Sequence, residues 1–175
     1  VVIGGDGSYR GGLSLAKRGI KVACLPGTID NDLNYTDATI GFNTALGTIL
    51  DLMSKVRDTS SSHERNTIIE VMGRNCGDLA LYAAVCGGAD ALLIPEKTVD
   101  LQVLVDRIRV GSQYGKLHNV ILKAEGVDIP IDELSELLES LTGRETRAVV
   151  PGYIQRGGSP SIQDRLFASQ AGYKA

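Results

Sequence analysis

The chain lacks tryptophan, and aromatic residues make up only 5% of its 175 residues. It therefore has few flat side chains on which the bases of a nucleic acid could stack. The formal net charge is −3, so no broad basic surface attracts nucleic acid or an anionic membrane. No apolar run is long enough to span a bilayer. We therefore expect neither nucleic acid nor membrane as a partner.

Residues that bind zinc or form disulfides are also scarce. Three cysteines, Cys24, Cys76 and Cys86, form no CxxC pair, and His63 and His118 are the only histidines. These are too few ligands for a credible zinc site. We expect the thiols to be free and reduced, as in a cytoplasmic protein.

The remaining composition is that of a globular protein, with 43% apolar and 22% charged residues. The length suffices for one ordinary domain or two small ones. The chain opens in "VVIGGDGS", which is typical of the end of a strand, and it does not begin with Met. We therefore expect it to be a fragment of a longer protein.

Short apolar runs alternate with helical patterns along the whole chain. Strands are expected at 1–3, 20–25, 66–73, 90–96, 119–126 and 146–152, and helices at 8–18, 37–57, 78–86, 100–114, 131–141 and 161–174. The strand cores are nearly continuous apolar runs, which is typical of parallel strands covered on both faces. The sequence thus predicts an α/β fold with a parallel sheet. The Ser-rich segment 58–65 suggests a mobile loop or a crossing between subdomains.

Polar residues and glycines follow several of the expected strands, at the edge where open α/β sheets bind ligands. Strand by strand they are Asp6, Gly7 and Ser8; Thr28, Asp30 and Asp32; Met72, Gly73 and Arg74; Glu125 and Gly126; and Tyr153 and Arg156. Each group taken alone is compatible with a simple turn. Their recurrence at one edge favours a binding site.

The first of these groups, "GGDG", fits neither common nucleotide motif. Arg10 stands where GxGxxG needs its third glycine, and Leu13 stands where a P-loop needs lysine. A glycine-rich strand-to-helix turn remains, whose amides can hold a phosphate. Asp6 beside it could hold Mg²⁺.

The acids of "PGTIDNDL" (26–33) suit phosphoryl transfer, which needs cations around the moving group and a base near the acceptor hydroxyl. Either Asp30 or Asp32 could be that base. Arg74 is either a surface residue or a group that stabilises phosphoryl charge. Arg156 either belongs to a turn or clamps a phosphate in bidentate fashion.

Taken together, several motifs resemble ATP-dependent 6-phosphofructokinase of the bacterial type. They are "GGDGS", "PGTIDNDL", "TIGFNTAL", "SHER", "EVMGRNCGDLAL", "GGAD", "AEGV" and "QRGGSP". The resemblance covers the whole chain, which matches the middle and later part of that enzyme. It implies transfer of the γ-phosphoryl group of ATP to the 1-hydroxyl of fructose 6-phosphate.

The resemblance assigns a role to each matching position. It implies Asp30 as the catalytic base, with Thr28 next to the transferred group and Arg74 stabilising charge in the transition state. It implies an ATP site at Gly5, Asp6, Gly7 and Ser8, with Asp6 binding Mg²⁺. The implied sugar-phosphate ligands are Asp32, Met72, Gly73, Glu125 and Arg156, together with Tyr153, which replaces the family's histidine. Arg65 and Arg147 would act in the site of a neighbouring subunit.

The resemblance also has implications beyond the active site. It implies an effector site at Arg57, Asp90 and Lys116, although Tyr114 replaces an arginine there. It further implies a homotetramer whose subunit has two similar three-layer αβα domains with mainly parallel sheets. Residues 1–41 and 155–175 would belong to the ATP domain and residues 42–154 to the sugar-phosphate domain.

Three alternatives stay open. They are a pyrophosphate-dependent relative, a different GGDG-type kinase acting on a lipid or NAD, and a non-catalytic module that binds a sugar phosphate or nucleotide. Pyrophosphate-dependent relatives carry Asp where Gly7 stands and Lys where Gly27 stands, so glycine at both positions predicts ATP as the donor.

Overall fold

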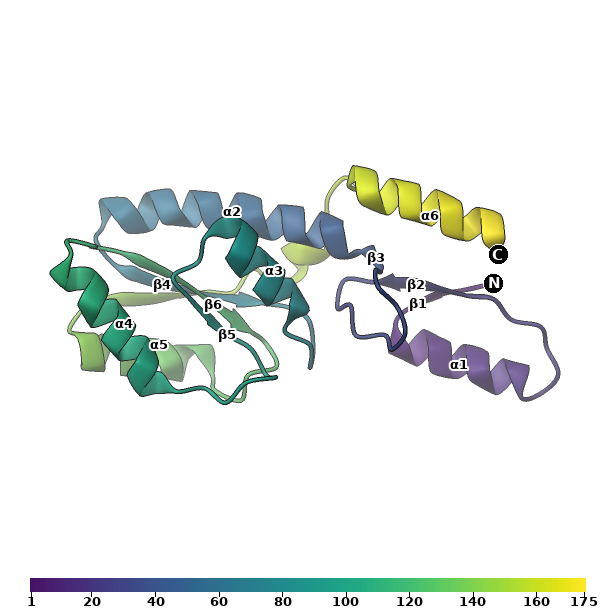
Figure 1. Cartoon of the computed structure of the whole chain (residues 1–175), viewed down its shortest axis with the longest axis horizontal. Coiled ribbons are helices and arrows are strands. Elements are labelled where there is room, and N and C mark those ends of the chain that lie inside the picture. The colour runs from purple at the N-terminus through teal and green to yellow at the C-terminus, as the bar shows by residue number, and fades with distance from the viewer.

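The strands form two separate parallel sheets in the computed structural model, which describes all residues from 1 to 175 (Figure 1). The N-terminal sheet has the order β1-β2-β3, with β1 (Val2–Gly4), β2 (Cys24–Thr28) and β3 (Ile40–Gly41). The central sheet has the order β5-β6-β4-β7, with β4 (Asn66–Val71), β5 (Ala91–Leu93), β6 (Asn119–Ala124) and β7 (Thr146–Val149). The expectation of an α/β fold with parallel strands is confirmed.

The helices connect and cover these sheets (Figure 1). They are α1 (Asp6–Ala16), α2 (Phe42–Ser62), α3 (Asp78–Gly87), α4 (Leu101–Gln113), α5 (Ile131–Thr142), the 3₁₀ helix η1 (Gly152–Arg156) and α6 (Ile162–Lys174). The long helix α2 runs from the N-terminal sheet to the central sheet, and α6 returns to contact β3. None of the helices is both long and apolar enough to cross a membrane.

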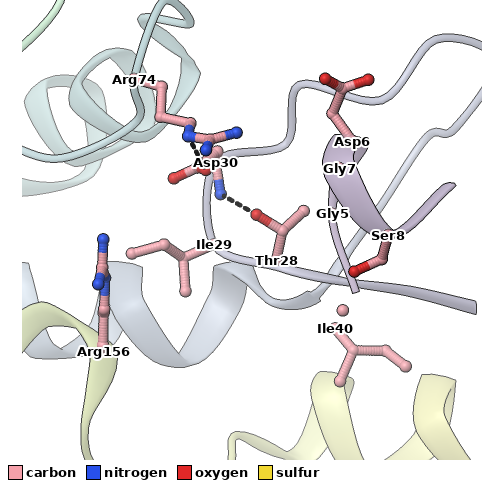
Figure 2. A pocket seen from close by; sticks show the side chains of 11 residues that line it. Gly5, Asp6, Gly7, Ser8, Thr28, Ile29, Asp30, Ile40, Arg74 and Arg156 are labelled. Carbon is pink, nitrogen blue, oxygen red and sulfur yellow. Dashed lines mark hydrogen bonds and ion pairs between the residues drawn. The ribbon is translucent and has the colours of Figure 1, made fainter. Parts of the chain in front are cut away.

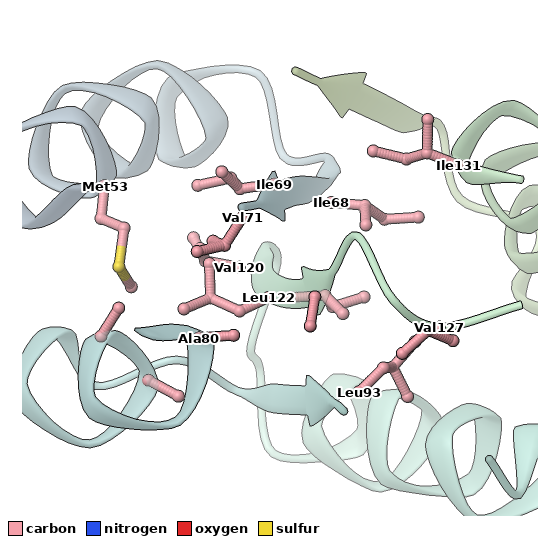
Figure 3. Close-up of a cluster of buried hydrophobic side chains, with 14 of the residues drawn as sticks. Met53, Ile68, Ile69, Val71, Ala80, Leu93, Val120, Leu122, Val127 and Ile131 are labelled. Atoms are coloured by element: carbon pink, nitrogen blue, oxygen red, sulfur yellow. The ribbon is translucent and has the colours of Figure 1, made fainter. Parts of the chain in front are cut away.

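The main hydrophobic core surrounds the central sheet (Figure 3). Alternate side chains of a strand point to opposite faces, so Ile69 and Val71 lie on the side of Met53 in α2. Ile68 lies on the opposite side, near Ile131 of α5. All members of this core lie between Phe42 and Leu138. The core therefore holds the central sheet rigid beneath the loops that follow its strands.

One ion pair is buried between two strands of the central sheet. The ammonium of Lys123 lies 2.8 Å from Glu70 Oε2, and the Lys123 side chain is only 2% exposed. The two residues are register partners in the parallel pair β4–β6. Because an unpaired buried charge is costly, this pair favours one alignment of the two strands.

Two expectations about α2 are wrong. The helix covers Phe42–Ser62, not 37–57. Most of the segment 58–65, expected as a mobile loop or a crossing between subdomains, is helical. The hydroxyls of Thr59 and Ser62 donate to carbonyls in the preceding turn. The hydroxyl of Ser60 is buried 2.5 Å from that of Thr67. These bonds satisfy the polar side chains, so the Ser-rich composition does not end the helix.

The second strand also differs from expectation, because β2 covers Cys24–Thr28 rather than 20–25. Its parallel pairing with β1 aligns Gly4 with Pro26, so the strand continues through the Pro-Gly pair. The strand β3 was not expected, and the expected loop after β7 contains η1. The remaining elements are present with shifted ends. The domain boundaries at residues 42 and 155 stay a prediction.

Candidate active site

A polar pocket of about 490 Å³ lies at the carboxyl end of the N-terminal sheet (Figure 2). Its walls come from the turn after β1, the loop after β2, and two arginines that follow strands of the central sheet. The lining residues are Gly5, Asp6, Gly7, Ser8, Gly27, Thr28, Ile29, Asp30, Ile40, Arg74 and Arg156. The structure thus brings together eight of the residues predicted from sequence: Gly5, Asp6, Gly7, Ser8, Thr28, Asp30, Arg74 and Arg156.

The turn after β1 presents the beginning of α1 to this pocket. Gly5 precedes the helix, and no side chain caps the first-turn amides. Such amides, together with the helix dipole, can bind a phosphate. A Cβ on Gly4 would collide with the Ser8 side chain, whereas a Cβ on Gly7 would meet nothing within 4 Å. The turn is therefore tightly packed behind Ser8 but open beside Gly7.

The loop after β2 aims Asp30 into the pocket. The Asp30 amide donates to Thr28 Oγ1 at 3.1 Å, which closes a local turn. Arg74 Nε lies 3.7 Å from Asp30 Oδ2, and Arg74 Nη1 lies 3.9 Å from Asp32 Oδ2. Figure 2 shows Asp30 between Arg74 on one side and Thr28 on the other. The acid, the hydroxyl and the guanidinium therefore converge.

The environment of Asp30 raises the pKa of its carboxyl group above the usual range. Burial is the largest cause, since the Asp30 side chain is only 16% exposed. The nearby charge of Asp32 acts in the same direction, while Arg74 and the Thr28 hydroxyl partly offset it. A carboxylate with a raised pKa accepts a proton more readily, which suits a general base.

The loop after β4 is held by two side chains from other elements. One oxygen of Glu125 accepts from the amides of Gly73 and Arg74, at 3.0 and 2.6 Å. The buried Gln155 accepts from the Met72 amide at 3.0 Å. Arg74 itself has a left-handed backbone with φ of 55°. These hydrogen bonds stabilise that backbone conformation and so fix the position from which the Arg74 side chain extends.

The predicted sugar-phosphate ligands Met72, Gly73 and Glu125 therefore adjoin the pocket without lining it. Asp32 has one buried oxygen, Oδ1, with no hydrogen-bond partner in the chain. Tyr153 is 79% exposed, and its ring lies 5.2 Å from the Arg156 guanidinium.

Arg65 and Arg147 lie elsewhere, in a second pocket of about 240 Å³ that Lys55 also lines. Arg65 directly precedes β4, whereas Arg74 follows it. At ~3.3 Å per residue, a strand of six residues separates them by about 20 Å. Neither arginine can reach Asp30 of the same chain.

The predicted effector residues form hydrogen bonds and an ion pair with other residues of the chain. Arg57 donates to the carbonyls of Gly87 and Gly88 at 2.6 and 2.9 Å. Lys116 forms an ion pair with Asp90. An effector at this position would have to compete with these contacts, and its role stays a prediction.

Sequence reasoning missed Gln155, Asn31 and Asp164, which support the site without lining its pocket. Gln155 lies in the motif "QRGGSP" and Asn31 in the motif "PGTIDNDL", so membership in a motif was the only sequence feature that could have pointed to them. Asp164 accepts hydrogen bonds from the amides of Gly41 and Thr44, which are more than 100 residues away in the sequence, so no local motif indicates its role.

The residues present fit Mg²⁺ in its usual phosphate-bound form. No group of three or more His, Cys, Asp or Glu residues is close enough to hold a metal ion by itself. Mg²⁺ in kinase sites needs only one or two carboxylates beside substrate phosphates and water. The Asp6 carboxylate lines the pocket and is 41% exposed, with Arg10 at 3.0 Å as its partner.

The sequence profile of the phosphofructokinase family matches residues 1–175. The chain belongs to this family. It is 55% identical to the ATP-dependent 6-phosphofructokinase of Clostridium botulinum and 57% identical to ATP-dependent 6-phosphofructokinase 1 of Clostridium perfringens, in both cases over all 175 residues. The alignment covers 54% of each relative, so the chain spans about half the length of these phosphofructokinases.

A solved structure shares the fold. The crystal structure of Pichia pastoris phosphofructokinase in the T-state superposes with a TM-score of 0.89 at 32% identity. The match covers 99% of this chain and 22% of that phosphofructokinase chain.

Proposed function

We propose that this chain forms part of an ATP-dependent 6-phosphofructokinase. That enzyme transfers the γ-phosphoryl group of ATP to the 1-hydroxyl of fructose 6-phosphate and releases fructose 1,6-bisphosphate and ADP. The observation that carries the proposal is the convergence of Asp30, Thr28 and Arg74 in one pocket with the glycine-rich turn. The similarity to ATP-dependent relatives supports the same reaction.

In this reaction Asp30 acts as the general base. The 1-hydroxyl donates its proton to the Asp30 carboxylate as the hydroxyl oxygen forms a bond to the γ-phosphorus. The bond between that phosphorus and the β,γ-bridging oxygen breaks, and ADP leaves with the electron pair. The buried position of Asp30 favours proton acceptance, because burial disfavours the charged carboxylate.

The remaining pocket residues stabilise negative charge. The amides of the turn at Gly5–Ser8 bind the ATP phosphates, and Asp6 would hold Mg²⁺. When bound, Mg²⁺ supplies positive charge that offsets the charge of the phosphate oxygens. The Arg74 side chain is 62% exposed and its ion pairs to Asp30 and Asp32 are long, so it is free to turn toward the transferred phosphoryl group.

The sugar phosphate binds beside the central sheet. The unpartnered Oδ1 of Asp32 accepts from a sugar hydroxyl, and Met72, Gly73, Glu125 and Arg156 complete the site with Tyr153. Tyr153 can donate a hydrogen bond but carries no positive charge. Arg65 and Arg147 bind the 6-phosphate of a neighbouring subunit, which implies an oligomer, here a tetramer. The enzyme would be cytoplasmic, and each subunit would have two similar domains.

The proposal is tested by a donor assay on a full-length phosphofructokinase that carries this sequence. Purified enzyme is incubated with fructose 6-phosphate and either MgATP or Mg-pyrophosphate, and product is measured. Efficient fructose 1,6-bisphosphate formation with ATP is expected. Preference for pyrophosphate would assign the chain to the other class of phosphofructokinase. Binding of both substrates without product from either donor would indicate a non-catalytic module.

A further inference from the structure

Asn31 stands between two acids of the proposed site but does not line the pocket. Its backbone is left-handed, with φ of 55°, a conformation that asparagine tolerates better than most residues. Asp30 and Asp32 face Arg74, while the Asn31 side chain forms its contacts elsewhere. Asn31 therefore has a role that the proposed chemistry does not explain.

The Asn31 side chain joins the loop after β2 to the helix α3. Its Nδ2 donates to Asp78 Oδ2 at 2.9 Å, and its Oδ1 accepts from the Thr39 hydroxyl at 3.4 Å. Asp78 is the first residue of α3, and Thr39 is 1% exposed. The Asn31 side-chain amide is thus held from both sides, by Asp78 of α3 and by Thr39 of its own loop.

Three side-chain contacts join this loop to the segment 74–78, and they differ in quality. The two ion pairs of Arg74 are 3.7 and 3.9 Å long, and its side chain is exposed. The contact between Asn31 and Asp78 alone has an ordinary hydrogen-bond length. If Arg74 turned toward a phosphoryl group its ion pairs would break, whereas the bond between Asn31 and Asp78 involves no reacting group and would remain.

We propose that Asn31 is a positioning residue, which acts through Asp78 to hold Asp30 opposite Arg74 across the gap between the two sheets. The inference rests on the proposed function, because it concerns the same site. It assigns the alignment of the base to the hydrogen bond between Asn31 and Asp78, and not to the two long ion pairs of Arg74.

A double-mutant cycle tests this role in a full-length phosphofructokinase carrying the sequence. Asn31→Ala and Asp78→Ala each remove one partner, and each should lower kcat roughly 10–100-fold, because a misplaced base reacts slowly. The KM for ATP should change less than about threefold, since neither residue binds the donor. The double variant should lose no more than the worse single variant, because both changes remove the same bond.

Three further variants distinguish loss of the hydrogen bond between Asn31 and Asp78 from backbone strain, from loss of the Asp78 charge and from an unspecific change in the loop. Asn31→Gly keeps the left-handed backbone but removes the amide, so its loss should match that of Asn31→Ala. Asp78→Asn keeps an acceptor oxygen and should lose far less than Asp78→Ala. Asn34→Ala changes an exposed residue of the same loop and serves as the control.

Amide hydrogen exchange over residues 27–34 supplies a readout that needs no turnover. The Asp30 amide is bonded to Thr28 Oγ1, so loosening of the loop should speed exchange in the variants that lose the bond. Additive losses in kcat, or a glycine variant with parental kcat, would overturn the inference while leaving the kinase assignment intact. If the parent shows no kinase activity, the proposed function fails. In that case, amide hydrogen exchange that is the same in the parent and in all variants would separately reject the positioning role of Asn31.

Discussion

At the scale of single residues, Gly7 and Gly27 bear on whether ATP or pyrophosphate is the phosphoryl donor, and the free space beside them differs. A Cβ on Gly7 would meet nothing within 4 Å, so a larger side chain has room there, at the wall of the pocket. A Cβ on Gly27 would lie 2.9 Å from Ile3 Cγ2 and 3.4 Å from the Gly4 nitrogen. A lysine at position 27 therefore requires the Ile3 side chain of β1 to shift, and Gly7 is the cleaner position to test.

Gly7→Asp should selectively impair use of ATP. A carboxylate there would face the donor phosphates, and two like charges ~4 Å apart near a protein surface repel by about 4 kcal/mol. The kcat/KM for MgATP should fall at least ~10²-fold. Gly7→Asn matches the added volume without the charge, and Gly11→Asp places the same charge on α1 outside the pocket. If Gly7→Asn loses as much as Gly7→Asp, volume and not charge limits the donor.

The residues proposed to carry the chemistry were predictable because they cluster in short motifs at strand ends. Asp30, Thr28 and Arg74 line one pocket, although they follow strands of two separate sheets and not of one sheet as the sequence argument assumed. Gln155 was not predictable as a support, because its partner Met72 is 83 residues away and only the fold brings them together.

At the scale of elements, α6 is joined to the beginning of α2 by one buried carboxylate. Asp164 is 3% exposed and accepts from the Gly41 and Thr44 amides at 2.9 and 2.8 Å. The hydroxyls of Thr44 and Ser161 donate to it as well. This side chain therefore caps α2 from a distant helix and keeps α6 beside the N-terminal sheet.

Asp164 should make stability depend on pH. Burial raises the pKa of its carboxyl group, but the hydrogen bonds outweigh burial and the net pKa is lowered. A depressed folded-state pKa contributes stability above the unfolded value, and this is lost as pH falls through the folded pKa. Asp164→Asn should thus cost about 1–3 kcal/mol of unfolding free energy at neutral pH, and less in acid.

Urea denaturation of the parent and the variant at a series of pH values measures this difference. Asp37→Asn, at an exposed position, is the matched control. A difference between parent and Asp164→Asn that is the same at every pH would contradict the role assigned to the carboxylate.

Element boundaries show where sequence patterns stop being informative. The apolar spacing identified α2, but Ser and Thr at 59–62 suggested its end too early, because their hydrogen bonds become visible only in three dimensions. The strand β3 has two residues, too few to produce an alternating pattern.

At the scale of the whole molecule, the second pocket lies away from the first. Arg65 in the second pocket precedes β4, whereas Arg74 in the first pocket follows it. The six residues of β4 separate Arg65 from Arg74, so one chain cannot bring Arg65 and Asp30 to the same substrate. A site shared between subunits, as proposed above, would resolve this separation.

Mixing inactive variants tests the shared site. Full-length Asp30→Asn and Arg65→Ala enzymes should each be nearly inactive, and co-assembled oligomers should regain activity, because some sites then contain an intact Asp30 and a partner's intact arginine. Asp30→Asn mixed with Arg74→Ala should regain nothing, since these residues line one pocket of one chain. Activity that fails to return in the first mixture would argue against sharing.

The central claim is that Asp30 is the base of a phosphofructokinase reaction, and Asp30→Asn in the full-length enzyme tests it most directly. The substitution keeps the size of the side chain but removes the proton acceptor. Steady-state kcat with ATP and fructose 6-phosphate should fall about 10²–10⁴-fold, while calorimetric binding of fructose 6-phosphate changes little. A kcat close to that of the parent would contradict the assignment.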